Sequence, residues 1–215
     1  VRKKREYFQK YDLAKLQDID RKKIPFWYPT NRMMNAPEDQ ERWGVKWRAG
    51  TSNFRTVDEL FTKRNLWALA ALRDAIEKSE MRDVLLFAFT GICLGFSKMC
   101  QWIPGASYPF PMMRGTYYMP QVFKEQRVLH YYSNRIDLIK RAADSIAING
   151  KVCVSTEDSR HLDSIPSNSV DYIFTDPPYA EKVQYGELNF IWESWLQLDT
   201  SWHGDEIIIN DVRGK

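Results

Sequence analysis

The sequence predicts an α/β protein in which a helical region precedes the strands of a partial parallel sheet. Apolar residues recur at helical spacing between residues 56 and 148. From residue 151 the pattern changes to short apolar runs, which are typical of strands. Strands alternating with a helix favour a parallel sheet. The predicted order is a strand at 151–155, a strand at 170–175, a helix at 187–196 and a strand at 207–209.

Residues 1–55 are predicted to be a basic, aromatic-rich irregular segment that contains one short helix. Asp12 is the candidate N-cap of this helix, which is expected to run to about Lys22. Pro25 should end it, because the residue before a proline disfavours the α region. The basic clusters at 2–5 and 21–23 are compatible with phosphate contacts, but such runs more often form a solvated face.

Residues 56–150 are predicted to be a helical region. Thr56 and Glu59 have the spacing of a capping box, in which each side chain satisfies a backbone donor near the other residue. This box should begin a helix that runs to about Lys78.

Two further helices are predicted in the same region. One begins near Glu80, and residues 84–89 are apolar on every side of it, which favours a central and buried position. The other spans about 124–148 and should stop at Asn149-Gly150. Residues 151–215 then form a third region, which contains the predicted strands.

The composition argues against several classes of protein. No apolar run is long enough to span a membrane, and the chain begins with charged residues, unlike a secretory signal. Cys93, Cys100 and Cys153 fit no zinc or disulfide spacing, which favours a reduced, cytoplasmic protein. Because the chain opens on Val1 rather than on methionine, we expect it to be a piece of a longer protein.

The motif Asp176-Pro177-Pro178-Tyr179 directly follows the strand predicted at 170–175. Its two prolines fix the backbone and remove two N–H groups, so the chain should leave the strand stiff and extended. The Asp176 carboxylate and the Pro177 carbonyl then form a fixed pair of acceptors, and Tyr179 provides an aromatic wall. This arrangement suits the exocyclic amino group of a nucleobase. An open α/β sheet also binds its ligands beyond the carboxyl ends of its strands.

This motif and its flanks at 158–162 and 165–171 resemble motif IV of the DNA methyltransferases that methylate adenine N6 or cytosine N4. Three further stretches, at 24–29, 60–69 and 187–193, resemble a subgroup of large bacterial and archaeal DNA methylases. The resemblance implies a Rossmann-like sheet, S-adenosylmethionine as the cofactor and DNA as the partner.

The resemblance also implies roles for individual residues. Asp176, Pro177, Pro178 and Tyr179 are the candidate catalytic residues, and Tyr179 is expected to stack on the target base. Asp158 is expected near the cofactor, with Glu157 as an alternative, although Asp158 is equally suited to be a helix N-cap. Tyr185 and Asn189 are expected to shape the target-base pocket, but Asn189 is also compatible with a polar helix position. No metal site is expected, because His130, His161 and His203 lack metal-ligand spacing.

The Gly-rich cofactor loop of the family is missing from this chain. Phe89-Thr90-Gly91 resembles it faintly, but the second glycine and the strand-turn-helix context are absent, so we interpret 89–93 as a buried helix. We therefore expect the remaining strands and the loop to lie in sequence outside this chain. The isolated fragment is accordingly expected to be inactive.

The predicted function is transfer of a methyl group to the exocyclic amine of a base flipped out of DNA. The resemblance implies that a motif beginning with Asp favours adenine N6, although enzymes that methylate cytosine N4 share the geometry. Two alternatives stay open. One is an RNA amino-methyltransferase that uses the same motif, and the other is a nucleic-acid-binding module without catalytic activity.

Overall fold

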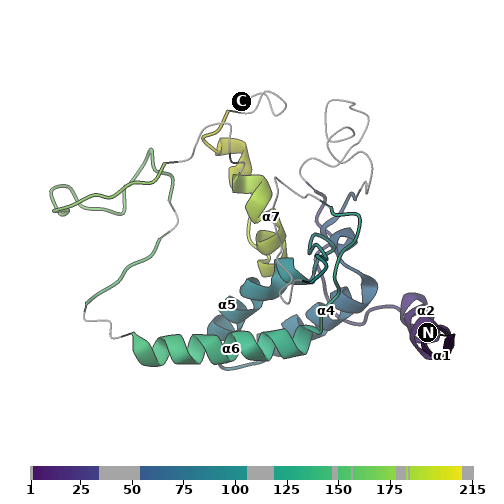
Figure 1. The fold of residues 1–215 in the computed structure, drawn as a ribbon. Helices are drawn as coiled ribbons and strands as arrows, with labels where there is room; N and C mark the ends of the chain where they lie inside the picture. The colour runs from purple at the N-terminus through teal and green to yellow at the C-terminus, as the bar shows by residue number, and fades with distance from the viewer. Residues whose placement is uncertain are drawn as a thin grey trace.

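The computed structural model describes residues 2–33, 54–105, 119–146, 150–155, 157–177, 183 and 185–209. Its main body is built from α-helices that pack on one another (Figure 1). Helix α5 contacts α4, α6 and α7, so it lies at the centre of the body. The bounds of these four helices are Lys63–Glu77 for α4, Arg82–Cys93 for α5, Val128–Ser145 for α6 and Tyr185–Leu196 for α7.

The prediction of an α/β fold with a partial Rossmann-like sheet is wrong for the described residues. None of the three predicted strands forms there, and the described backbone contains only isolated bridges, such as the one between Phe61 and Ser97. In the first two of these segments large apolar side chains are exposed: Val154 is 89% exposed and Phe174 is 82% exposed. A strand is stabilised by packing against its neighbours, and these segments have none in the described residues.

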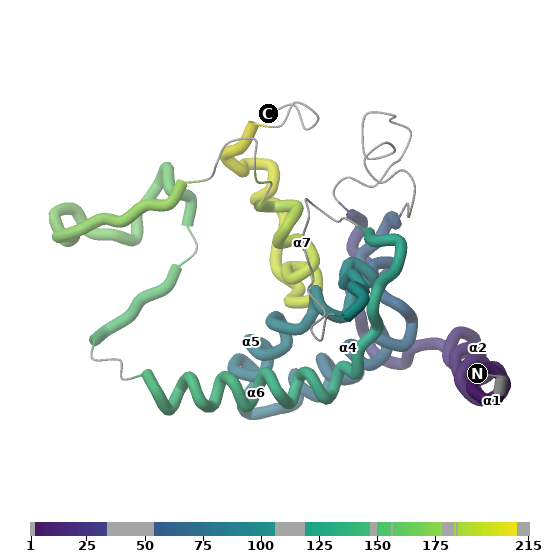
Figure 2. Tube along the Cα trace, viewed as in Figure 1, coloured from purple at the N-terminus to yellow at the C-terminus, as the bar shows by residue number. Residues whose placement is uncertain are grey.

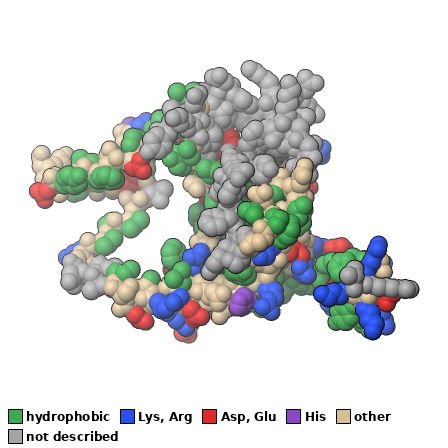
Figure 3. Space-filling view, in the orientation of Figure 1, with side chains coloured by type: hydrophobic (Ala, Val, Ile, Leu, Met, Phe, Trp, Pro, Cys, Tyr) green, Lys and Arg blue, Asp and Glu red, His purple; other side chains and the backbone are tan. Residues whose placement is uncertain are grey.

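Residues 150–155 and 157–177 instead form a long excursion that contains only short turns (Figure 2). The excursion extends away from the helical body after α6 and comes back toward α7. Hydrophobic atoms cover much of its surface in the space-filling view (Figure 3). It is therefore joined to the helical body at its ends rather than packed along its length.

The N-terminal helix is longer than predicted. It consists of α1 (Arg2–Tyr7), a π-helical stretch η1 (Phe8–Leu13) and α2 (Ala14–Arg21). Asp12 lies inside η1, so its predicted role as an N-cap is wrong. The predicted end before Pro25 is confirmed, because α2 ends at Arg21. Helix α2 contacts α4, whose first residue, Lys63, donates a hydrogen bond to the Asp20 carbonyl at 2.6 Å.

The predicted capping box is also wrong. Residues Val57–Leu60 form a short 3₁₀ helix, η2, and the Thr56 side chain makes no capping hydrogen bond. The Glu59 carboxylate instead accepts a hydrogen bond from the backbone N–H of Arg55. The N-cap of α4 is Thr62, whose hydroxyl accepts from the Asn65 N–H at 3.3 Å. A break before Thr62 lets the chain place Phe61 in the core.

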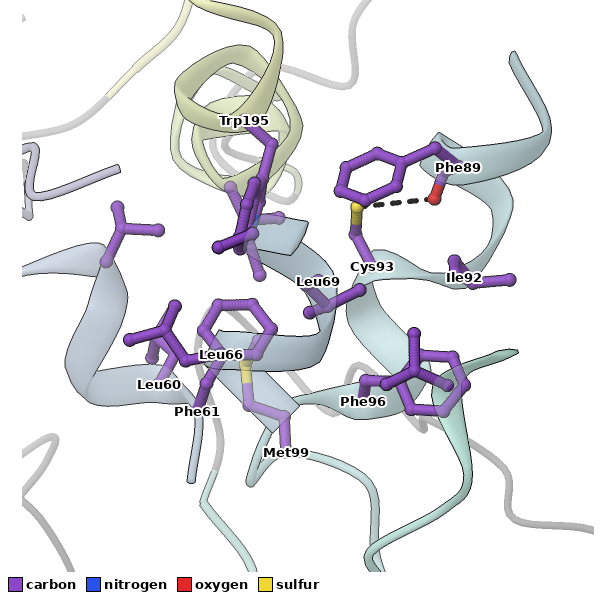
Figure 4. Close-up of a cluster of buried hydrophobic side chains, with 14 of the residues drawn as sticks. Leu60, Phe61, Leu66, Leu69, Phe89, Ile92, Cys93, Phe96, Met99 and Trp195 are labelled. Carbon is purple, nitrogen blue, oxygen red and sulfur yellow. Dashed lines mark hydrogen bonds between the residues drawn. The ribbon is translucent and has the colours of Figure 1, made fainter. Parts of the chain in front are cut away.

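The core lies where α4, α5 and α7 meet, and Trp195 of α7 is at its centre (Figure 4). Trp195 is fully buried and meets three aromatic rings edge to face, Phe89 at 5.4 Å, Phe61 at 5.7 Å and Trp27 at 6.3 Å between centroids. Leu69 of α4 and Cys93 of α5 fill the space beside them. Helix α7, which lies about 100 residues after α5 in the sequence, therefore completes the core formed by α4 and α5.

Several side-chain hydrogen bonds hold the helices in register, and three of them are made by Trp192, Tyr132 and Asn65. Trp192 of α7 donates its indole N–H to the Thr90 carbonyl at 2.9 Å, and the Tyr132 hydroxyl of α6 donates to the Leu85 carbonyl at 3.0 Å. Burial raises the pKa of Tyr132, so the hydroxyl keeps its proton and stays a donor. The third bond runs from the Asn65 amide to the carbonyl that ends η3 (Leu94–Phe96), at 3.1 Å.

The remaining helix predictions are largely confirmed. Residues 89–93 are helical as interpreted, α6 falls inside the predicted range 124–148, and α7 matches the predicted helix at 187–196 closely. Helix α5 is less enclosed than expected, because Phe87 is 67% exposed. Across the described residues, no helix combines the length and the apolarity that crossing a membrane requires.

Candidate functional site

A cavity of about 390 Å³ lies between the end of the excursion and the C-terminal segment. We call it the Asp176 cavity. The excursion contributes Asp176 and Ser159 to its lining, and the first residue of α7, Tyr185, contributes a phenol ring. The remaining lining comes from the short 3₁₀ helix η4 (Ser201–Asp205) and the residues after it, namely Trp202, Glu206, Ile207 and Ile208.

The wall formed by α7 and η4 is held together at the start of α7. The backbone N–H of Gly186 donates a hydrogen bond to the Glu206 carboxylate at 2.8 Å. The missing side chain allows this close approach, because a Cβ atom here would lie 2.8 Å from a Glu206 oxygen and 3.1 Å from the His203 ring and would displace the Glu206 carboxylate. The segment after η4 is thereby fixed beside Tyr185.

A buried polar pair also holds η4 against α7. Nε2 of His203 lies 2.8 Å from a carboxylate oxygen of Glu193, and both side chains are almost fully buried. The indole ring of Trp202 packs edge to face on His203, with 4.3 Å between ring centroids. Residues 10 apart in sequence thus fold η4 back onto α7 and set the position of Trp202 in the cavity.

The opposite wall contains the first half of the predicted catalytic motif. Asp176 and Pro177 are both exposed, and Asp176 lines the same cavity as Tyr185. Pro178 and Tyr179 lie outside the described residues. Asn189 is exposed one turn further along α7 and is not part of the cavity lining. The structure therefore brings together two of the predicted residues, Asp176 and Tyr185.

The predicted cofactor residues do not line the Asp176 cavity. Asp158 is engaged by Arg160, whose guanidinium contacts the carboxylate at 2.5 Å and whose backbone N–H donates to it at 2.9 Å. Glu157 accepts a hydrogen bond from the Ser164 hydroxyl. No helix follows Asp158 directly, so the alternative of a helix N-cap is wrong. Both carboxylates are thus hydrogen-bonded by nearby residues, and the expectation that they lie near a cofactor stays a prediction.

The Asp158–Arg160 pair predicts a measurable pH dependence. Hydrogen bonds from Arg160 lower the pKa of Asp158 from 3.8 to about 2. The turn is therefore stabilised above the pKa of the unfolded chain, and this stabilisation is lost as the pH falls through about 2. We expect an NMR titration of the Asp158 carboxyl carbon to show a midpoint well below 3.8.

An Arg160→Gln variant is the control for this titration. It removes the guanidinium but keeps the backbone donor, so the midpoint should move back toward the ordinary value for aspartate. The pair is exposed, so the thermal midpoint of the whole chain at neutral pH should change little. A midpoint that is the same in both proteins would contradict the assignment of the low pKa to Arg160.

The buried cysteines are poor candidates for a nucleophile. The Cys93 thiol is buried and donates to the Phe89 carbonyl at 3.3 Å, and burial raises its pKa strongly (Figure 4). Burial also raises the pKa of Cys100. Both thiols therefore resist ionisation, and the thiolate is the reactive form.

Sequence reasoning missed two residues of the site, Trp202 and Glu206. Their only sequence signal is that they lie within five residues before the apolar run at 207–209. His203, whose sequence spacing indicates no metal-binding role, anchors η4 to α7. Together the cavity presents two aromatic rings and the carboxylates of Asp176 and Glu206. Such a lining suits a planar ligand that carries N–H donors.

Comparison with protein-family models, with curated proteins and with solved structures finds no match for this chain. The function of the Asp176 cavity is therefore argued from its own residues and from the motif that supplies Asp176.

Proposed function

We propose that this chain carries the target-base side of a DNA amino-methyltransferase. In this proposal the substrate is the exocyclic amine of a base flipped out of the duplex, with adenine N6 preferred over cytosine N4. The observation that carries the proposal is the position of Asp176, which shares one cavity with the aromatic rings of Tyr185 and Trp202. S-adenosylmethionine is the proposed cofactor and would supply a methyl group bound to a positively charged sulfur.

The proposed role of Asp176 follows from the chemistry of aromatic amines. The lone pair of such an amine is delocalised into the ring, so the nitrogen is a poor nucleophile. An N–H group that donates to the Asp176 carboxylate, and a second that donates to the Pro177 carbonyl, hold the nitrogen with its lone pair available. Positive charge builds on that nitrogen during methylation, so a fixed carboxylate stabilises the transition state more than the ground state.

The aromatic rings of the cavity support the base-flipping part of the proposal. Unstacking a base costs a few kcal/mol, and stacking on an aromatic side chain returns about 1–3 kcal/mol per base. Tyr185 and Trp202 both line the cavity, from the start of α7 and from η4. In the proposal, either residue can stack on a base whose amine donates to Asp176.

A methylation assay tests the proposal directly. The full-length protein is incubated with isotope-labelled S-adenosylmethionine and either duplex DNA or RNA of the same sequence, and the products are digested to nucleosides and identified by mass spectrometry. We expect label in N6-methyldeoxyadenosine from DNA. Label in RNA alone would favour the RNA enzyme instead. Binding of DNA without transfer of label would favour a non-catalytic module and would overturn the proposal.

A further inference from the structure

A second cavity, of about 550 Å³, lies between α5, α6 and α7 on the helical body. We call it the α6 groove. It shares no lining residue with the Asp176 cavity. Its apolar lining includes Phe96 and Leu138, and two aromatic rings, Tyr131 and Trp192, form part of its wall. Helix α6 also contributes polar groups, namely Asn134, Arg135 and Arg141.

The two arginines give the α6 groove a positive charge. Arg135 donates one hydrogen bond to the Gly91 carbonyl at 3.1 Å, and Arg141 donates one to the Asp137 carbonyl at 3.3 Å. Each guanidinium has five N–H donors, so each retains donors beyond these bonds. No carboxylate lines the groove, and neither arginine forms an ion pair within the described part of the chain. The groove is therefore complementary to an anion.

The position of Arg135 depends on a glycine in the facing helix. A Cβ atom at Gly91 would lie 2.7 Å from Nε of Arg135, which is closer than side chains tolerate. The absence of a side chain at Gly91 lets the guanidinium approach α5 closely and donate to the Gly91 carbonyl. The charge at this end of the groove is thus placed by packing and not left to a freely rotating side chain.

The aromatic walls are held in position as well. The Trp192 indole is fixed by its hydrogen bond to the Thr90 carbonyl at 2.9 Å. The Tyr131 ring packs edge to face on Phe96, with 5.9 Å between centroids and an interplanar angle of 72°. A planar ring that enters the groove would therefore meet preformed aromatic surfaces, so few side chains would lose conformational freedom on binding.

We propose that the α6 groove binds a nucleotide, with its phosphate on Arg135 and Arg141 and its base against Tyr131 and Trp192. The guanidinium fork matches phosphate oxygens in two parallel hydrogen bonds, and aromatic side chains stack on any base. The volume is in the range of small-molecule sites. The nucleotide is either free in solution or one unit of a single strand. The inference stands independently of the methyl-transfer proposal.

Calorimetric titration of the purified chain tests the ligand class. The probes are deoxyadenosine monophosphate, deoxyadenosine, inorganic phosphate, a short oligodeoxyadenylate and a poly-glutamate peptide. We expect the monophosphate to bind at least about tenfold more tightly than the nucleoside or phosphate alone, because it uses both halves of the groove. Binding of the oligonucleotide but not of the monophosphate would identify a strand as the source. Equal binding of poly-glutamate, or no nucleotide binding, would overturn the proposal.

Point variants locate the binding. Arg135→Gln and Arg141→Gln should each weaken nucleotide binding by about tenfold or more. Lys140→Gln is the matched control, because Lys140 is exposed on the same helix outside the groove lining and the charge change is identical. Gly91→Ala should also weaken binding by displacing Arg135, although it removes no charge.

Circular dichroism separates loss of binding from loss of folding in these variants. The exposed arginine changes should leave the helical signal and the thermal midpoint close to those of the unmodified chain. If Lys140→Gln weakens binding as much as the arginine variants do, then binding is general surface attraction and the proposed groove is wrong. Unchanged binding in both arginine variants would overturn it equally.

Discussion

Replacing Trp195 with alanine is expected to lower the free energy of unfolding by about 3–5 kcal/mol, the range for truncating a large buried aromatic residue. Trp195 is fully buried and packs edge to face on Phe61 and Phe89. It joins α7 to the two helices that precede it in the core. A domain of this size has a stability of about 5–15 kcal/mol, so the loss is a large fraction of the total.

Urea denaturation followed by far-ultraviolet circular dichroism measures this effect. Trp102→Ala is the control, because Trp102 is about half exposed and its loss should change stability by about 0.5 kcal/mol or less. The loss of stability for Trp195→Phe should fall between the two, since this variant keeps an aromatic ring in the core and leaves a smaller cavity than alanine does. A loss below about 1 kcal/mol for Trp195→Ala would show that α7 is not part of the cooperative core.

The helices of the body could be predicted because their signal is local. Apolar residues at helical spacing located α6 and α7, and both formed within a few residues of the predicted ends. The start of α4 was misplaced because two threonines, Thr56 and Thr62, each precede a helix-compatible run. The choice between them depends on burying Phe61 against Trp195, which is a contact with a residue far along the chain.

The strands could not be predicted correctly because a short apolar run is compatible both with a strand and with irregular backbone. An apolar run such as 170–175 shows that the side chains favour burial, but it does not supply the neighbour that a strand requires. In the described residues no such neighbour exists, and Val154 and Phe174 stay exposed. Hydrophobic pattern alone therefore overestimated the sheet.

The Asp176 cavity was predictable only in part for a similar reason. The motif identified Asp176, and the resemblance identified Tyr185, because both are properties of short stretches of sequence. Trp202 reaches the cavity only through the buried pair of His203 and Glu193, which folds η4 onto α7. No sequence pattern in residues 201–206 predicts the packing of η4 on α7. The contribution of Trp202 to the cavity is therefore visible only in the structure.

Asp176→Asn is expected to reduce the rate of methyl transfer by about 10²–10³-fold in the full-length protein, the range for removing one group that stabilises charge in a transition state. The substitution keeps the size of the side chain and one oxygen acceptor, so the cavity and its other lining residues should be preserved. What it removes is the negative charge that stabilises the developing positive charge on the amine. The rate should therefore fall while the affinity for S-adenosylmethionine stays within about twofold, well under 1 kcal/mol.

The matched control is Asp171→Asn, because Asp171 is exposed in the same excursion but does not line the Asp176 cavity. Both variants remove one charge from the same segment, so a general electrostatic effect on DNA binding would appear in both. Steady-state rates with saturating DNA and direct titration of the cofactor separate the two contributions. If Asp176→Asn retains the full rate, or if Asp171→Asn loses as much, the carboxylate at position 176 is not the group that stabilises the reacting amine. The proposed chemistry of the cavity would then be wrong, because its remaining acidic residue, Glu206, is already bonded to the backbone of Gly186.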